Sequence, residues 1–163
     1  MTDEVIAATE EPVVPLMGDE AHAAPAAQNF ALAVPAGIAA AVAGAVLWAV
    51  FTYLTGMELG LIAIAVGAMA GLAIRAVGKG RDHRFAILGA ACAAFGCVLG
   101  IGLSDIAVLA KLEGVSLLTA FQTLGLGGTV TLAVQAGDAM ELLFVAIAVW
   151  EGWKLAVHRA PRD

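Results

Sequence analysis

The chain has 163 residues, of which 61% are hydrophobic and only 13% are charged, and it contains 19 glycines. Soluble domains are about half apolar and about one quarter charged, so this composition excludes an ordinary soluble protein. The net charge of −6 comes from residues 1–29, which hold six acidic residues and no Lys or Arg. An acidic tail is not typical of a nucleic-acid-binding arm, so no nucleic-acid partner is expected.

Residues 1–30 are acidic and rich in Ala and Pro, which predicts a tail that buries little surface. Four apolar segments follow, each close to the roughly 20 residues that a helix needs to cross a bilayer. The predicted spans cover residues 33–55, 59–77, 85–103 and 139–157. The sequence therefore predicts an all-α polytopic membrane protein, with four transmembrane helices in a domain that covers residues 31–158.

Residues 104–138 connect the third and fourth spans. Ser104 and Asp105 are expected to end the third span. Beyond them, apolar residues recur at helical spacing with polar residues between them, at Leu117, Leu118, Phe121 and Leu124. This pattern predicts an interfacial amphipathic helix. Residues 129–134 could be extended, or could enter the bilayer partway.

Positive charge predicts the orientation. Four of the eight Lys and Arg residues lie at 75–84 and three lie at 154–162. Short loops rich in Lys and Arg stay cytoplasmic, and four spans place both clusters on the same side. The N- and C-termini are therefore expected in the cytoplasm, with residues 104–138 on the opposite side. The basic residues that are expected to contact lipid headgroups are Arg75, Lys79, Arg81 and Arg84.

Small residues recur at a spacing of four. Gly67 and Gly71 form one GxxxG pair, and Gly96 and Gly100 form another. Such pairs let helix backbones approach closely in lipid. Two interpretations remain open, namely contact with another membrane chain and packing within this bundle.

Three acidic residues near the ends of the fourth span form a candidate polar site. Asp138 and Glu141 lie three residues apart, while Glu151 lies deeper, three residues before Lys154. They could bind a cation or relay a proton, as a transporter would require. Alternatively, the first two begin the helix and Glu151 pairs with Lys154. No charge lies at the middle of a predicted span, which argues against an ion pathway.

Cys92 and Cys97 are five residues apart and do not share a helical face, so packing is expected rather than a disulfide or a metal pair. The histidines and acidic residues follow no metal-ligand spacing, and no nucleophile motif is present. Neither an enzyme nor a cofactor is expected.

A spaced signature runs from about residue 45 to residue 158. It includes Trp48-Ala49, Thr55-Gly56, Gly67, Gly71, Arg75, Gly78-Lys79-Gly80, Gly96-Cys97, Leu99-Gly100, Glu141-Leu142-Leu143-Phe144 and Glu151-Gly152. This order of motifs resembles a group of small bacterial multi-span membrane proteins. The resemblance implies a four-helix fold in the bacterial inner membrane, with residues 104–138 on the periplasmic side. It implies no activity, cofactor or catalytic residue.

These features favour a structural or accessory subunit that contacts the lipid bilayer and either a membrane-protein partner or further copies of itself. The alternative is a small oligomeric transporter or channel that uses the acidic residues at the membrane ends.

Overall fold

The computed structural model describes residues 28–57, 60–136 and 138–157, and within them the chain forms five helices and no strand. The predicted all-α class is confirmed. Most of the predicted acidic tail, residues 58–59 and the last basic residues of the chain lie outside the described residues. The helices are α1 (Phe30–Thr55), α2 (Leu61–Gly78), α3 (His83–Glu113), α4 (Leu117–Ala136) and α5 (Ala139–Leu155).

Local capping sets both ends of α1. The side chain of Asn29 accepts a hydrogen bond from the Leu32 N–H at 3.1 Å, so the helix begins three residues before the predicted span. Pro35 therefore lies in the second turn. Gly56 ends the helix with φ of 70°, and its N–H donates to the Thr52 carbonyl oxygen at 2.7 Å. Glycine adopts this left-handed conformation without a steric cost.

The prediction that Ser104 and Asp105 end the third span is wrong, because α3 continues to Glu113. The Ser104 hydroxyl donates to the Ile101 carbonyl oxygen at 2.9 Å, so the helix itself satisfies this buried polar group. Beyond it, Ile106 and Ala110 are buried and continue the packed face. The buried apolar face of α3 therefore continues beyond Ser104 and Asp105.

Helix α4 is kinked at Gly125, which has φ of 65° and ψ of −175°. Residues 117–124 form the first arm, where the predicted amphipathic segment is indeed helical. Residues 126–136 form the second arm, so of the two alternatives for residues 129–134 the extended one is wrong. At a rise of 1.5 Å per residue the arms are only about 12 and 16 Å long, so neither arm alone matches a bilayer core.

Within the described residues, four helices are long and apolar enough to cross a membrane, namely α1, α2, α3 and residues 117–135 of α4. The predicted number of such helices is confirmed, but the set differs. The predicted fourth span corresponds to α5, which has 17 residues. The segment that was expected at the membrane surface instead supplies the apolar but kinked α4.

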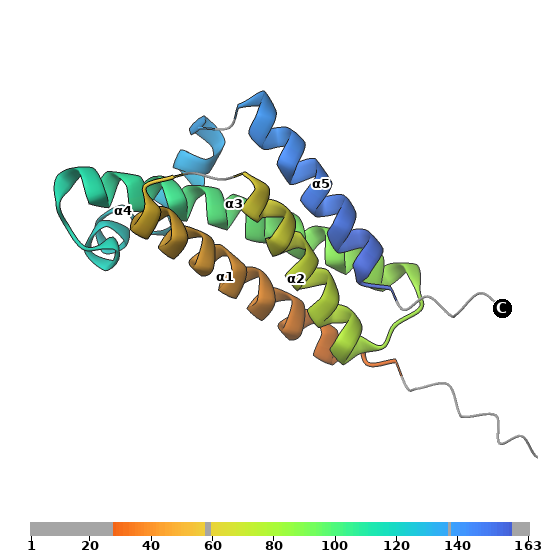
Figure 1. Cartoon of the computed structure of the whole chain (residues 1–163). Coiled ribbons are helices and arrows are strands. Elements are labelled where there is room, and N and C mark those ends of the chain that lie inside the picture. Colours follow the sequence, from red (N-terminus) through yellow and green to blue (C-terminus); the bar gives the residue numbers. More distant parts are fainter. Residues whose placement is uncertain (1–27, 58–59, 137, 158–163) are drawn as a thin grey trace, which may run out of the picture.

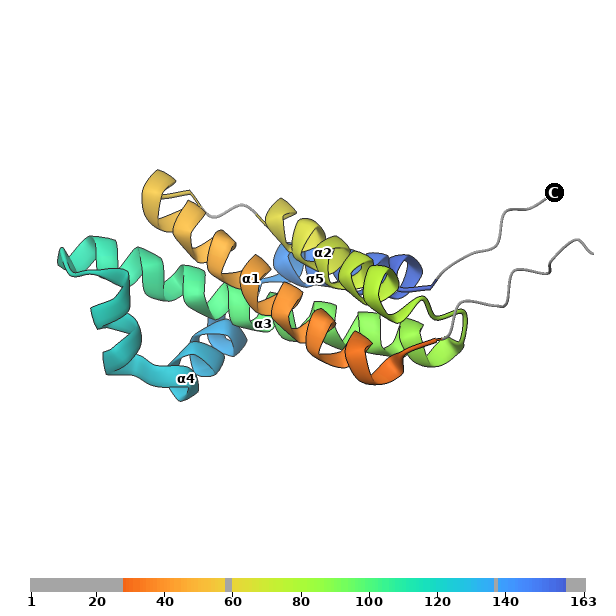
Figure 2. The same ribbon diagram turned by 90° about the horizontal axis from the view of Figure 1, so that it is seen from below.

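Helix α3 lies at the centre of the bundle and contacts each of the other four helices (Figure 1). One end of the bundle gathers the start of α1, the α2–α3 loop and the end of α5. There, the Asn29 N–H donates to the Gly78 carbonyl oxygen at 3.0 Å, and the ring centroids of His83 and Trp153 lie 4.5 Å apart. We call this the basic end. Helix α4 lies at the opposite end of α3 (Figure 2).

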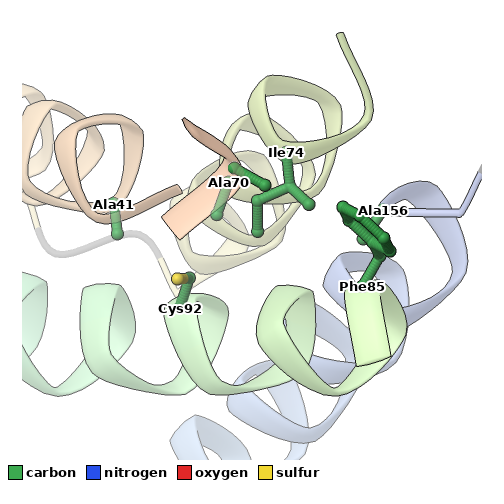
Figure 3. Packing of buried hydrophobic residues seen from close by; sticks show 7 residues of the cluster. Ala41, Ala70, Ile74, Phe85, Cys92 and Ala156 are labelled. Atoms are coloured by element: carbon green, nitrogen blue, oxygen red, sulfur yellow. The ribbon is translucent and has the colours of Figure 1, made fainter. Parts of the chain in front are cut away.

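The core is built mainly from small side chains. In the part near the basic end, residues from α1, α2 and α3 meet the C-cap residue of α5, Ala156 (Figure 3). Its members are Ala33, Ala41, Ala70, Ile74, Phe85, Cys92 and Ala156. Helices that meet through alanine and glycine approach closely, which is how helix association is achieved inside lipid.

Candidate functional site

The first GxxxG pair lies where α2 meets α5. A methyl group built on Gly67 would collide with the carbonyl oxygen of Ala148, and one on Gly71 would lie 2.9 Å from the carbonyl oxygen of Gly152. In both cases the neighbour is backbone, which cannot rotate away. These glycines therefore set how closely α2 and α5 approach.

The second GxxxG pair faces α1 and α2. A methyl group on Gly96 would lie 2.7 Å from a Val66 side-chain carbon, and one on Gly100 would lie 2.5 Å from the Trp48 ring. Trp48 is only 2% exposed, so its ring fills the space that Gly100 leaves. All four predicted packing glycines thus lie at contacts within this one chain.

The predicted headgroup residues lie together at the basic end. Arg75 is in the last turn of α2, and Lys79 caps that helix with φ of 48°. Lys79, Arg81 and Arg84 are exposed, whereas Arg75 is half-buried. The loop is held inward by Phe85, which is 2% exposed and packs edge-on against the ring of Phe30 at 5.3 Å.

The three candidate polar residues do not form one site. Asp138 is the N-cap of α5, and its carboxylate accepts a hydrogen bond from the Glu141 N–H at 2.7 Å. Glu151 lies ten residues after Glu141, or about 15 Å further along the helix axis, where its carboxylate is 3.5 Å from the ammonium of Lys154. The first two therefore begin α5, and Glu151 belongs to the opposite end of the bundle.

Both cysteines are free and buried, in different parts of the core. Cys92 lies among the small residues near the basic end, and the thiol of Cys97 lies 3.8 Å from the Ala63 carbonyl oxygen. Among the described residues, no group of three His, Cys, Asp or Glu side chains could hold a metal ion.

An apolar groove of about 590 Å³ runs between α1, α3 and residues 117–126 of the kinked α4. Its walls come from α1 and α3, and residues of the first arm of α4, together with Leu126 of the second arm, complete the lining. None of its lining residues belongs to α2 or α5. The lining residues are Val42, Val46, Ala49, Phe95, Leu99, Leu103, Leu117, Leu118, Phe121 and Leu126.

The sequence prediction did not identify this groove. Val42, Val46 and Ala49 recur at helical spacing on α1, and Phe95, Leu99 and Leu103 do so on α3, so each wall is visible as an apolar stripe. No pattern in the sequence says that these two stripes lie beside each other, or that α4 folds back over their end.

In comparisons with protein-family models, with curated proteins and with solved structures, no match to this chain was found.

Proposed function

We propose that this chain is a structural or accessory subunit of a larger membrane assembly and carries out no chemistry of its own. The observation that carries this proposal is the apolar groove between α1, α3 and α4. The proposed occupant is a transmembrane helix of a partner protein.

The groove suits a helix because every lining residue is apolar, and such a surface recognises shape rather than polar groups. Phe95 is 48% exposed and Leu118 is 65% exposed, so large side chains remain available for packing. Inside lipid, helices associate through close contact and through release of lipid chains. A rigid partner helix loses less conformational freedom in a groove than a flexible acyl chain does.

The internal use of the small-residue faces also supports a different partner rather than a second copy of this chain. Gly67 and Gly71 already face α5, and Gly96 and Gly100 already face α1 and α2. A dimer built through these glycines would have to separate helices of the bundle. The separation of Glu141 from Glu151 likewise gives no support to a shared transport pathway.

For the topology, we propose that α1, α2, α3 and α5 cross a bacterial inner membrane with the basic end in the cytoplasm. The shared location of the 75–84 loop and Lys154 supports this orientation, because loops rich in Lys and Arg are retained there. The kinked α4 then folds back on the periplasmic side. The lipid bilayer surrounds the remaining apolar faces.

The partner is tested by photo-crosslinking in intact cells. A photoreactive phenylalanine analogue is placed at Phe95 or at Leu118, both in the groove. The matched control is Leu142, which is also 65% exposed but lies on α5, away from the groove. We expect discrete protein adducts from the groove positions and none from Leu142, and mass spectrometry should assign the adduct to an apolar transmembrane segment of another protein.

Three results would contradict the proposal. Adducts with lipid alone would show that the bilayer fills the groove, and adducts with the mass of two copies of this chain would indicate a homo-oligomer. Equal protein crosslinking from Leu142 would show that the groove has no special role. Purification in mild detergent provides an independent measurement, in which recovery of the free monomer alone would count against a stable assembly.

A further inference from the structure

Two basic segments that are far apart in the sequence line one recess at the basic end. The recess has a volume of about 350 Å³, and its polar lining comes from the α2–α3 loop and from the end of α5. The lining residues are Arg81, His83, Ala86, Trp153, Lys154 and Val157. The recess is separate from the apolar groove and shares no residue with it.

Aromatic contacts hold its two sides together. The rings of His83 and Trp153 meet edge-on, with centroids 4.5 Å apart and an interplanar angle of 79°. On the other side, the Lys154 ammonium lies 4.7 Å from the centre of the Trp150 ring and 3.5 Å from a Glu151 carboxylate oxygen. These two contacts hold the Lys154 ammonium in place, and the Glu151 carboxylate would compete with a bound anion for it.

The first turn of α3 borders the recess through His83 and Ala86. Asp82 is the N-cap of this 31-residue helix, but its side chain makes no capping hydrogen bond. The helix begins at His83, which lines the recess. The first N–H groups of a helix and its dipole both favour an anion.

We propose that this recess binds the phosphate of an anionic phospholipid. Arg81 and Lys154 supply the cationic contacts, and Arg in particular matches phosphate oxygens with paired donors. Trp153 supplies the amphipathic ring that is typical of the headgroup level of a membrane. Basic recesses between transmembrane helices on the cytoplasmic side are suited to anionic headgroups. The assignment rests on the topology proposed above, but it does not depend on the proposed partner helix.

The test is a lipid titration of the full-length purified protein, followed by native mass spectrometry. The probe is dioleoyl phosphatidylglycerol, with dioleoyl phosphatidylcholine as the zwitterionic reference. We expect a clear preference for the anionic lipid, and a loss of affinity of about fivefold for Arg81→Gln and for Lys154→Gln. The matched control is Lys111→Gln, which also removes one positive charge but lies near the end of α3, outside the recess, and should change affinity less than twofold.

Glu151→Gln provides a test of opposite sign. It removes the carboxylate that competes for Lys154, so the affinity for phosphatidylglycerol should rise. Addition of inorganic phosphate distinguishes the two sources of the phosphate group. Retention of bound phosphatidylglycerol in its presence supports a lipid site, whereas displacement would overturn the lipid assignment in favour of a soluble anion.

Equal affinity for the two lipids would overturn the site. An effect of Lys111→Gln as large as that of Arg81→Gln would also overturn it, because diffuse surface charge would then explain the binding. Circular dichroism and size-exclusion chromatography establish that each variant is folded. Arg81→Lys should restore part of the lost affinity.

Discussion

At Gly67 a single hydrogen atom faces the backbone of α5. The nearest atom to an added methyl group would be the Ala148 carbonyl oxygen, followed by other backbone atoms of that residue. A flexible side chain can rotate away from a new methyl group, but a helical backbone can move only by shifting the whole helix. The glycine is therefore required by a neighbouring helix and not by its own backbone conformation.

We expect Gly67→Ala to destabilise the bundle by roughly 1–3 kcal/mol, the usual cost of overpacking. Unfolding of the purified protein by SDS, followed by circular dichroism, measures this change. Ala65→Val is the control, because Ala65 is exposed on the same helix and its added methyl groups face outward. Equal stability of the wild-type protein and Gly67→Ala would contradict the close α2–α5 contact.

The sequence identified Gly67, Gly71, Gly96 and Gly100 as small residues at helical spacing, but it left the identity of their neighbours open. The spacing marks a face on which another backbone can approach. It contains no information on whether that backbone belongs to the same chain. Only the position of α5 shows that Gly67 and Gly71 pack internally.

At the scale of the elements, the kink of α4 depends on one residue. Gly125 combines a positive φ with an extended ψ, a region of backbone space that is essentially limited to glycine. Around it, Ala120 of the first arm packs against Ile106 and Ala110 of α3. The second arm returns alongside α3, where Thr129 faces Gly102. Both arms reach α3 only because the chain turns at this point.

Gly125→Ala should cost roughly 1–3 kcal/mol at the kink and loosen the packing of both arms on α3. Hydrogen–deuterium exchange in lipid nanodiscs should show faster exchange in residues 117–136, while α1 and α2 keep their protection. The matched control is Gly127→Ala, because Gly127 is helical and an added methyl group would meet no atom within 4 Å. Unchanged exchange in Gly125→Ala would contradict the role assigned to this glycine.

The helix ends show where prediction from the sequence fails. Ser104 and Asp105 suggested an end because polar residues usually mark the membrane boundary, yet the helix backbone accepts the Ser104 hydroxyl bond internally. The actual end at Gly114 is a glycine with φ of 71°, and its neighbours alone do not distinguish it from the many other glycines. The position at which α3 ends therefore depends on local hydrogen bonds and backbone conformation, which amino-acid composition does not predict.

At the scale of the whole molecule, the sequence predicted that two basic clusters lie on one side, and the structure describes the first cluster and Lys154 of the second. Their common side followed from an even number of crossings. The described parts of the chain do bring the 75–84 loop and Lys154 to one end of the bundle. The groove could not be predicted in the same way, because it needs the relative placement of α1, α3 and α4, which share no periodic pattern.

Orientation in the membrane is expected to depend on the loop charges. Replacement of Lys79, Arg81 and Arg84 by Gln should convert a single orientation into a mixture, because only Arg75 and the end of α5 then retain positive charge on that side. A reporter enzyme that is active only in the periplasm, fused to the C-terminus, measures the mixture. Lys111→Gln, on the opposite side, should leave the orientation unchanged. A single unchanged orientation in the triple variant would show that other features determine it.

The unequal helix lengths have a consequence for the surrounding bilayer. Helices α1 and α3, with 26 and 31 residues, rise about 39 and 46 Å, whereas α2 and α5, with 18 and 17 residues, rise about 27 and 26 Å. A hydrocarbon layer of about 30 Å is too thin for the first pair and slightly too thick for the second. In the topology proposed above, we therefore expect the long helices to tilt or to extend beyond the hydrocarbon layer, as the charged residues near the end of α3 allow, and the bilayer to thin beside the short helices. With that topology, we expect the protein to fit best in a bilayer that is thicker beside α1 and α3 than beside α2 and α5.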